Sequence, residues 1–478
     1  MAKTLLIRGE WSAGSGRSFA VRNPATGESV GEASDAGRDD ALSAIHAAHE
    51  AFPAWGTLPA RDRAAVLLRW NLLLLSRQED LARTLVLENG KPIKEARTEV
   101  AYGAGFVEWS AEEAKRVYGE TIPHSIPGKR HFVLKQPVGV TAAISPWNFP
   151  LAMVTRKVAP ALAAGCTVVL KPAEQTPLTA VRAFELLQEA GAPPGVANLV
   201  TSSDPAAIGE ALLGDPRVRK ITFTGSTEVG KLLMRGSADH VKKLSLELGG
   251  CAPFLVFADA DLDKAAEGLL WCKFRNAGQT CICANRVYVE EPVYEEFLRR
   301  FTERVRTLKV GNGLSEESQI GPLIDAAALA KTEEHVADAV RRGARVVCGG
   351  KRRSEGDLAR GSFFEPTVLA GATADMRCMA EETFGPVAPL APFRTEEEAV
   401  RLANDTRFGL AAYFYTRDVS RVVRLMERLE YGIIGANDPS PAVPQAPFGG
   451  FKESGLGREG GRYALEEFLE VKHVCLGI

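Results

Sequence analysis

The spacing of apolar residues predicts helices over the first quarter of the chain and then a change to strands. Apolar positions recur at helical spacing in residues 39–55, 61–89 and 101–117. The second of these segments ends in Asn89-Gly90-Lys91-Pro92, which is a typical helix stop. Residues 130–137 alternate instead between apolar and polar positions, and this alternation predicts a strand.

Short apolar runs and helical segments alternate from residue 139 onwards. The strands expected first are residues 139–145, 167–171, 197–200 and 220–224, with helices across 151–164 and 177–190. A second series of strands begins near residues 252–257 and continues at 286–290, 344–348 and 411–415. Strand–helix alternation predicts a doubly wound parallel sheet. The two series predict an α/β cofactor domain followed by an α/β catalytic domain.

Bulk composition narrows the class of protein further. A chain of 478 residues is too long for one hydrophobic core. It has 58 Lys and Arg against 60 Asp and Glu, which gives no electrostatic reason to expect nucleic acid or an anionic membrane as a partner. Lys3 and Arg8 interrupt the N-terminal apolar stretch, so no signal peptide is expected. Eight cysteines without zinc-like spacing predict a cytoplasmic protein with reduced thiols and no metal.

Three polar residues stand in contexts that fit catalysis. Cys281 lies in a polar, Gly-containing stretch with Arg275 and Arg286 nearby, surroundings that can favour a thiolate. Most cysteines, however, are small buried hydrophobes. Glu247 lies in a mostly apolar segment where its pKa can rise, although most Glu side chains are simply at the surface. Asn148 is equally a turn or cap residue. The residues alone leave each alternative open.

Motifs in a fixed order resemble the aldehyde dehydrogenase superfamily, and most closely its NAD(P)-dependent succinate-semialdehyde dehydrogenases. The paired signature is Gly278-Gln279-Thr280-Cys281 with Glu247-Leu248-Gly249-Gly250. Further matching segments are Pro146-Trp147-Asn148-Phe149-Pro150, Lys171-Pro172-Ala173-Glu174, Phe223-Thr224-Gly225-Ser226, Glu382-Thr383-Phe384-Gly385-Pro386 and Pro447-Phe448-Gly449-Gly450. The resemblance covers nearly the whole chain.

The resemblance implies an architecture as well as an activity. It implies an α/β fold with a doubly wound NAD-binding domain in residues 1–121 and 140–248. An α/β catalytic domain would follow in residues 249–446. Residues 122–139 and 447–478 would form a small oligomerisation strand element and a return segment. We therefore expect a homodimer or homotetramer, and the tail at 466–476 is expected to be an edge strand that pairs across subunits together with the 130s segment.

The same resemblance assigns chemical roles. Cys281 resembles the nucleophile that forms a thiohemiacetal with an aldehyde and then a thioester. The side-chain amide of Asn148 and the backbone N–H of Cys281 resemble the donors to the oxyanion. Glu247 resembles the general base that activates water for hydrolysis. A CoA-acylating relative is the rival enzyme, but that branch lacks this base. The rival of another class is a non-catalytic oligomer on the same fold.

The cofactor site has no Gly-x-Gly-x-x-Gly motif after a strand. The nearest substitute is Thr224-Gly225-Ser226 at a helix start, which offers backbone donors to a pyrophosphate but is equally an ordinary cap. The resemblance adds contacts to the cofactor from Trp147, Lys171, Glu174, Gly225, Ser226, Leu248, Glu382 and Phe384. A carboxylate at Glu174 would accept hydrogen bonds from a ribose and repel a 2′-phosphate. We therefore expect NAD rather than NADP.

The resemblance also suggests the substrate. Arg156 and Arg275 resemble the arginines that hold a substrate carboxylate. Succinate semialdehyde is therefore expected first. Related enzymes have a Ser near Ala442, and its absence leaves glutarate or 2-oxoglutarate semialdehyde, or a broader aldehyde range, as alternatives. Cys283 resembles the second cysteine of a redox-switch disulfide with Cys281, although a simple packing role is equally open.

Overall fold

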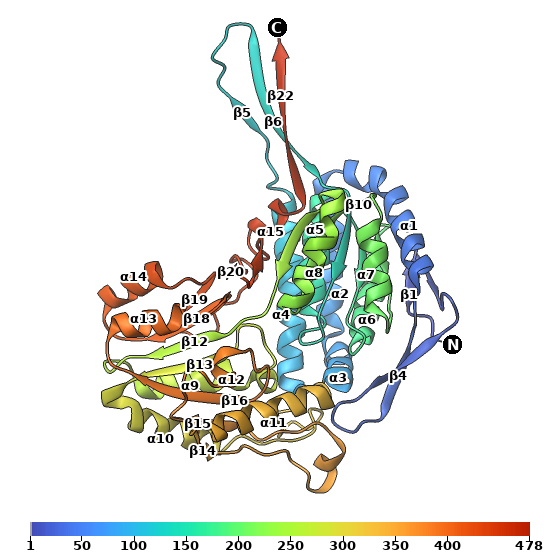
Figure 1. Cartoon of the computed structure of the whole chain (residues 1–478). Coiled ribbons are helices and arrows are strands. Elements are labelled where there is room, and N and C mark those ends of the chain that lie inside the picture. The colour runs from blue at the N-terminus through green and yellow to red at the C-terminus, as the bar shows by residue number, and fades with distance from the viewer. Residues whose placement is uncertain (1) are drawn as a thin grey trace.

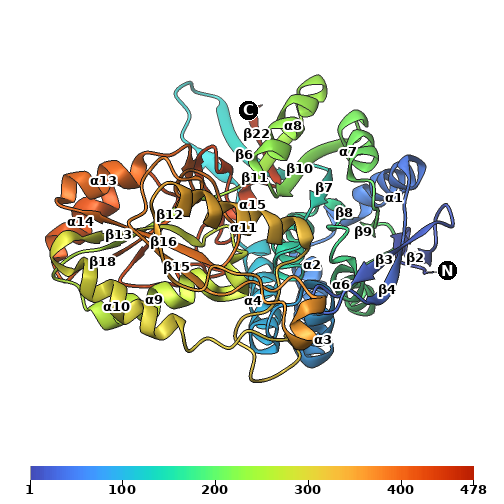
Figure 2. The ribbon, with the colours of Figure 1, turned by 60° about the horizontal axis from the view of Figure 1, so that its bottom comes forward.

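Two α/β parts and a protruding arm make up the protein. The computed structural model describes residues 2–478. Figure 1 shows one α/β part on the right, a second on the left, and an arm of three strands rising above them. Figure 2 shows the helices α2 (Ala60–Ser76) and α4 (Ile93–Ala114) between the two parts. Among the described helices, none combines the length and the apolar character that a membrane span requires.

The first part is built on an eight-stranded sheet with the order β2-β1-β9-β8-β7-β10-β11-β21. Its strands are β2 (Glu10–Ser12), β1 (Leu5–Ile7), β9 (Ala197–Leu199), β8 (Thr167–Lys171), β7 (Val140–Ile144), β10 (Val218–Thr224), β11 (Lys243–Glu247) and β21 (Gly455–Leu456). The five from β9 to β11 are parallel. The sheet is doubly wound, because β8 and β9 follow β7 on one side while β10 and β11 lie on its other side.

Alternating side chains bury both faces of this sheet. Ala142 and Val169 pack with α1 (Arg38–Thr57) and α7 (Pro205–Gly214) on one face. Ala143 and Val168 pack on the other face, with α5 (Ala152–Ala164), α6 (Pro177–Glu189), α2 and α4. This explains why β7 and β8 are apolar at nearly every position, as expected for parallel strands covered on both sides.

The chain reverses its winding direction between β7 and β10. The register pairs Ile144 with Lys171 and with Phe223, and Thr224 with Glu247. The segments that follow β8, β7, β10 and β11 therefore leave the same edge of the sheet. In open α/β sheets this carboxyl edge, at the reversal point, is where ligands bind.

The second part is a seven-stranded sheet with the order β14-β15-β16-β13-β12-β18-β19. The strands are β14 (Arg345–Cys348), β15 (Thr367–Ala370), β16 (Val387–Phe393), β13 (Ala284–Glu290), β12 (Ala252–Val256), β18 (Ala411–Tyr415) and β19 (Ile433–Ala436). Only β14 is antiparallel to its neighbour. Its helices are α9 (Leu262–Phe274), α10 (Tyr294–Val305), α11 (Ala326–Arg341), α13 (Glu396–Asn404) and α14 (Val419–Arg428).

The arm is a three-stranded sheet formed by two distant segments of the chain. Its strands are β5 (Glu120–Ile122), β6 (Lys129–Pro137) and β22 (Leu469–Gly477), in the order β22-β6-β5. The C-terminal strand and the 130s segment pair with each other within the chain, and β22 is an edge strand as expected. The outer edge of β22 faces away from β6, so the arm still offers an unpaired strand edge (Figure 1). The expected domain bounds stay a prediction.

Two helices differ from the pattern-based expectation. Residues 61–89 form two helices, because the backbone leaves helical geometry at Arg77, with φ −105° and ψ 21°. The second helix, α3 (Gln78–Asn89), can then turn to pack against α6. Neither Gly nor Pro marks this break, so the apolar spacing runs through it. Helix α4 begins at Ile93, directly after Pro92, eight residues before the expected start.

Candidate active site

Cys281 belongs to the lining of two cavities. One cavity is lined by Glu95, Thr98, Glu99, Tyr102, Phe149, Met153, Arg156, Trp271, Arg275, Thr280, Cys281, Ile282, Ser440, Ala442 and Phe448. The other is lined by Pro146, Trp147, Asn148, Thr224, Gly225, Ser226, Leu248, Gly249, Cys281, Ala328, Lys331, Glu382, Thr383 and Phe384. We name them the tail cavity and the cofactor cavity. A molecule in either one can reach the same thiol.

The loop that leads to Cys281 contains three consecutive residues in the left-handed backbone conformation. Asn276, Ala277 and Gly278 have φ values of 51°, 55° and 76°. Non-Gly residues in this region store about 1–3 kcal/mol each and persist only when surrounding contacts enforce them. At Gly278 a Cβ would lie 2.3 Å from the carbonyl oxygen of Gly385, so only glycine fits. The turn is therefore held by its neighbours rather than by its own preference.

The thiol of Cys281 is partly buried. Burial raises the pKa of Cys281 to about 12, with Arg156 acting to lower it and Glu247 acting to raise it. The protein as described therefore holds this group as a thiol at neutral pH. A nucleophilic thiolate would need a nearby base or an added positive charge to form.

Glu247 supplies a carboxylate that no other group satisfies. It is the last residue of β11 and is 2% exposed. Neither of its carboxylate oxygens has a hydrogen-bond partner within residues 2–478. Burial raises its pKa well above the usual range for Glu, and the nearby carboxylate of Glu459 adds to this. A carboxylate with a raised pKa binds a proton more readily than an ordinary Glu, as a general base requires.

Asn148 presents an amide beside the nucleophile loop. Its Nδ2 donates to the carbonyl oxygen of Gln279 at 3.3 Å, and its Oδ1 accepts from the N–H of Phe149 at 3.1 Å. One Nδ2 hydrogen of Asn148 remains for another acceptor. The backbone N–H of Cys281 makes no hydrogen bond with another residue of the described chain. These two donors next to the thiol match the requirement for stabilising an oxyanion.

Polar and aromatic residues on two loops form the far wall of the cofactor cavity. The rings of Trp147 and Phe384 meet edge to face at 5.4 Å, and Phe384 holds a left-handed φ of 54°. Glu382 Oε1 accepts the N–H of Gly250 at 3.0 Å, and burial raises the pKa of Glu382 to about 7. A Cβ at Gly249 would lie 3.0 Å from Glu382 Oε2, so the backbone and this carboxylate are in close contact.

The Thr224-Gly225-Ser226 segment caps a helix, which is one of the two roles that the sequence allowed. Ser226 Oγ accepts from the N–H of Val229 at 3.3 Å and so caps α8 (Thr227–Ser237), while the N–H of Gly225 donates to the carbonyl of Glu247 at 3.0 Å. Gly225 and Ser226 also line the cofactor cavity. The positive end of the α8 dipole is therefore directed at that cavity, where it favours an anionic group.

Lys171 and Glu174 lie outside the lining of both cavities. Lys171 Nζ forms an ion pair with Glu174 Oε2 at 2.9 Å, directly after β8. Lys171 is paired in register with Ile144 of β7, the strand that leads to Trp147 and Asn148. The pair therefore lies at the same sheet edge as the cofactor cavity, one strand away from it.

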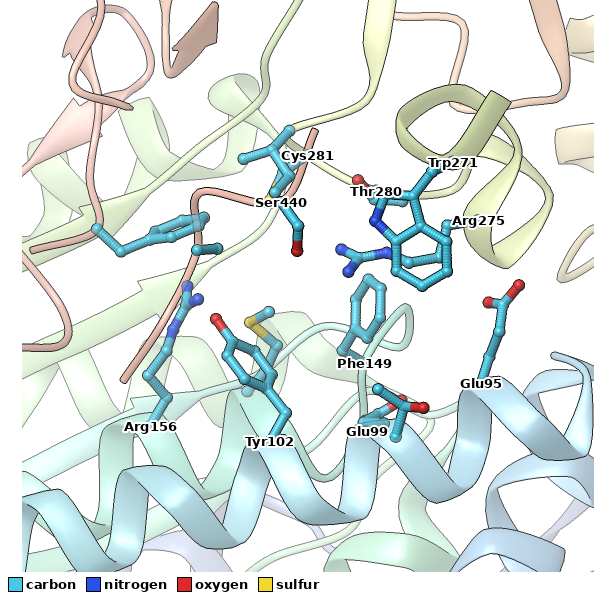
Figure 3. A pocket seen from close by; sticks show the side chains of 15 residues that line it. Glu95, Glu99, Tyr102, Phe149, Arg156, Trp271, Arg275, Thr280, Cys281 and Ser440 are labelled. Carbon is cyan, nitrogen blue, oxygen red and sulfur yellow. The ribbon is translucent and has the colours of Figure 1, made fainter. Parts of the chain in front are cut away.

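Arg156 lines the tail cavity and has two guanidinium nitrogens without a hydrogen-bond partner. Its Nε forms a buried ion pair with Glu459, and its guanidinium carbon lies 4.1 Å from the Phe448 ring centroid. Both Nη1 and Nη2 are buried and have no hydrogen-bond partner within residues 2–478. Arg275 lies with its guanidinium 5.1 Å from the ring of Phe149. Figure 3 shows both arginines directed into the cavity.

Two hydroxyl groups of this cavity were not expected. Figure 3 shows the hydroxyls of Ser440 and Tyr102 directed toward the space between the two arginines. The sequence drew attention to Ala442 as a missing serine, yet Ser440 supplies a hydroxyl from the same proline-rich segment. Only the path of that segment decides which of its side chains faces inward, so spacing alone could not identify Ser440.

Cys283 has surroundings different from those of Cys281. It is 1% exposed and lines neither cavity, and it accepts a hydrogen bond from Lys273 Nζ at 3.2 Å. No cysteine of the described chain is in a disulfide. Within residues 2–478 no cluster of three His, Cys, Asp or Glu side chains is suited to a metal ion.

These features together define the class of the protein. The reversal point of the doubly wound sheet adjoins the cofactor cavity, and this cavity shares Cys281 with the tail cavity. The buried carboxylate of Glu247 raises the pKa of that cysteine. The chain belongs to the aldehyde dehydrogenase family, whose model matches residues 11–474. The recognition, the fold class and the enzyme class expected from the motifs are confirmed.

Named relatives match along nearly the full length. The chain is 55% identical to a succinate-semialdehyde dehydrogenase [NADP(+)] of Escherichia coli, covering 99% of this chain and 97% of that one. It is 56% identical to a 3-sulfolactaldehyde dehydrogenase of Pseudomonas putida (98% and 96% covered) and 54% identical to a glutarate-semialdehyde dehydrogenase of the same species (99% and 97%). A crystal structure described as an E. coli NADP dependent enzyme superposes with a TM-score of 0.98 at 54% identity, covering 100% and 98%.

The relatives do not support one expectation. The family's cofactors are NAD or NADP, and the E. coli relative is named for NADP(+). The preference for NAD over NADP that Glu174 predicts therefore depends on that residue alone.

Proposed function

We propose that this protein oxidises an aldehyde that carries an anionic group at its far end, with succinate semialdehyde as the first candidate. The observation that carries the proposal is the buried guanidinium of Arg156, whose two Nη groups have no partner within the described chain. Glu459 pairs with the charge of Arg156, but buried N–H donors without an acceptor are costly unless a ligand accepts hydrogen bonds from them. Arg275 adds a second cation to the same cavity. A carboxylate is the natural partner for such forked donors.

The chemistry begins at Cys281. The carboxylate of Glu247 takes the thiol proton, and the sulfur attacks the aldehyde carbon to form a thiohemiacetal. The oxygen that becomes negative accepts hydrogen bonds from Asn148 Nδ2 and the N–H of Cys281. A nicotinamide dinucleotide, when bound, supplies the hydride acceptor for the oxidation. Collapse of the thiohemiacetal leaves a thioester on Cys281. The hydride must leave toward the cofactor cavity, which Cys281 also lines.

Glu247 provides the base for the second half of the reaction. Its carboxylate takes a proton from water, which attacks the thioester and releases the carboxylic acid. The raised pKa of Glu247 makes its carboxylate a stronger base than that of an ordinary Glu. Its unpaired oxygens are free to contact water without breaking an existing hydrogen bond. This base is also the reason to prefer hydrolysis over transfer of the acyl group to CoA.

The residues at the sheet edge fit a dinucleotide. Gly225 and Ser226 at the start of α8 would hold its pyrophosphate. Trp147, Leu248, Glu382 and Phe384 line the same cavity and would contact the nicotinamide half. Lys171 and Glu174 would hold the adenine ribose. The carboxylate of Glu174 carries the preference for NAD, because it would repel a 2′-phosphate.

The length of the substrate and the chemistry of its far end are proposed on further evidence. The relatives include enzymes named for succinate, glutarate and sulfolactate aldehydes, whose substrates all carry an anionic group. Ser440 and Tyr102 add hydroxyl donors to the same cavity. Glutarate or 2-oxoglutarate semialdehyde therefore remains the alternative substrate.

The assembly and the compartment belong to the proposal as well. Exposed apolar side chains on β22, among them Val471 and Leu476, lie along a strand with one unpaired edge. Such an edge favours addition to another sheet. We therefore expect a homodimer or homotetramer. Free cysteines throughout the described chain fit the reducing cytoplasm.

The test compares Arg275→Ala with the unchanged protein on three aldehydes. For succinate and glutarate semialdehyde, kcat/KM should fall roughly 100-fold, in line with a lost charge-assisted contact of about 1.5–3 kcal/mol. For hexanal, kcat/KM should change by less than about threefold. Equal losses on all three would remove the anion-binding role. Absence of any NADH formation by the unchanged protein would favour the non-catalytic alternative.

A further inference from the structure

The buried thiol of Cys283 is in contact with an amine. Lys273 Nζ donates to Cys283 Sγ at 3.2 Å, and Cys283 Sγ donates to the carbonyl oxygen of Lys273 at 3.5 Å. Lys273 lies in the last turn of α9, and Cys283 directly precedes β13. A helix end and a strand start therefore hold the two groups together from opposite sides.

Lys273 and Cys283 are fully buried, and the proposed reaction uses neither of them. Lys273 is 0% exposed and Cys283 is 1% exposed. The other side-chain contact of Lys273 Nζ is Asn285 Oδ1 at 3.2 Å, and within residues 2–478 no carboxylate lies within ion-pair distance of it. A fully buried lysine usually has a charged partner. Neither residue lines the tail cavity or the cofactor cavity.

We propose that Lys273 and Cys283 form a reversible oxidative cross-link, in which one oxygen atom bridges Lys273 Nζ and Cys283 Sγ. The oxidant is hydrogen peroxide, a small neutral molecule. The cross-link replaces the disulfide with Cys281 that the sequence suggested, because the neighbour of the Cys283 sulfur is an amine.

The reaction balances with two molecules of peroxide. The first oxidises the Cys283 thiol to a sulfenic acid and leaves one water. The second removes one hydrogen from the Lys273 amine and one from the sulfenic acid, joins nitrogen to that oxygen and leaves two waters. Sulfur and nitrogen each lose two electrons, and the four electrons reduce the two peroxide molecules. Two equivalents of a dithiol reverse the process by returning four electrons.

The position of the pair connects it to the active site. Arg275 follows Lys273 by two residues on the same helix end, and Cys281 precedes Cys283 by two residues in the nucleophile loop. A covalent bridge would pull α9 and the start of β13 toward each other and move both residues. Because a displacement of about 1 Å can lower a rate about 100-fold, the bridge should slow aldehyde oxidation by roughly tenfold or more. This effect on activity, unlike the bridge itself, rests on the proposed function.

The test uses the full-length protein treated with hydrogen peroxide and then digested for mass spectrometry. The expected product joins the peptide of Lys273 to the peptide of Cys283, with one oxygen gained and two hydrogens lost. Cys281→Ala should form the same product, since the bridge does not involve that sulfur. The lowered rate of NADH formation should return after treatment with a dithiol. Lys273→Arg keeps a cation at the site and Cys283→Ser keeps a hydroxyl, and neither variant should cross-link.

Any of four results would overturn the inference. One is a link between Cys281 and Cys283 with no oxygen gained. Another is a Cys283 that gains oxygen without losing hydrogen, or that is not modified at all. The last is a cross-linked mass that persists in Lys273→Arg. If a variant does not fold, the masses of the unchanged protein and of Cys281→Ala still decide the matter. Failure of the proposed function would show instead as no aldehyde oxidation before any peroxide is added.

Discussion

The side-chain amide of Asn276 joins the loop of Asn148 to the loop of Cys281. Its Nδ2 donates to the carbonyl oxygen of Asn148 at 2.9 Å and to the carbonyl oxygen of Gln279 at 3.2 Å. Its own backbone is left-handed, with φ 51°, and its N–H donates to Glu95 Oε2 at 2.7 Å. The two proposed oxyanion donors, on different loops, are therefore set relative to each other by one residue.

Replacing this donor should lower turnover more than binding. Asn276→Asp retains a residue that tolerates the left-handed turn, but it removes both amide hydrogens. We expect kcat to fall about 10- to 100-fold with little change in the KM for the cofactor, because the loss acts on the oxyanion. Asn276→Gly is a second variant that also lacks the donors but relieves the backbone strain, so a similar fall in kcat in both would assign the effect to the lost donors. An unchanged kcat in both variants would contradict the role of the Asn276 amide in positioning the oxyanion donors.

The thiol of Cys281 should react with iodoacetamide in a strongly pH-dependent way when no cofactor is bound. With a pKa of about 12, its thiolate fraction grows about tenfold per pH unit between pH 7 and pH 10. Glu247→Gln should accelerate the reaction, because the Glu247 charge raises the pKa of Cys281. Labelling of Cys281, quantified by peptide mapping with Cys281→Ala as the blank, measures this. A rate that is flat above pH 7 would show that the thiol is already ionised.

Glu247→Gln should make the folded protein more stable at alkaline pH. Burial raises the pKa of Glu247 in the folded state above its value in the unfolded chain, so the stability that its protonated form contributes is lost as the pH rises through the folded-state pKa. Glutamine escapes this loss, and the gain should be about 1–3 kcal/mol where Glu247 is ionised. The melting temperature of the variant should exceed that of the unchanged protein at pH 9. The difference should shrink at pH 5, and the opposite trend would contradict the burial argument.

Glu174→Ser should shift the cofactor preference. The carboxylate of Glu174 lies beside Lys171, and a unit charge at short range near the protein surface is worth about 1–4 kcal/mol against a phosphate. The ratio of kcat/KM for NADP to that for NAD should rise at least tenfold. Glu174→Asp keeps the charge and serves as the control. An unchanged ratio in the serine variant would place the preference elsewhere.

The parallel sheets could be predicted from the sequence because their strands are apolar at nearly every position. Residues 167–171 were expected as a strand and form β8 with the same bounds. The break at Arg77 could not be predicted, since it depends on how α3 packs against α6 rather than on a local Gly or Pro. The pairing of β22 with β6 likewise depends on two segments more than 300 residues apart.

The candidate site shows a similar division. Cys281, Glu247 and Asn148 were expected from motifs, and the structure brings them to one place. Ser440 and Asn276 were not predicted, because their importance depends on which way a loop turns. Lys273 was missed for a related reason. It belongs to an apolar helix, and nothing along the chain shows that its amine lies against Cys283.

The covalent role of Cys281 and the hydrolytic role of Glu247 are tested most directly by trapping the thioester. Glu247→Gln is mixed with NAD and succinate semialdehyde, and both NADH and the intact mass of the protein are measured. The account predicts one rapid equivalent of NADH per subunit, a much slower steady rate, and a succinyl group on Cys281. Steady turnover at the rate of the unchanged protein, or an acyl group on any other residue, would contradict it.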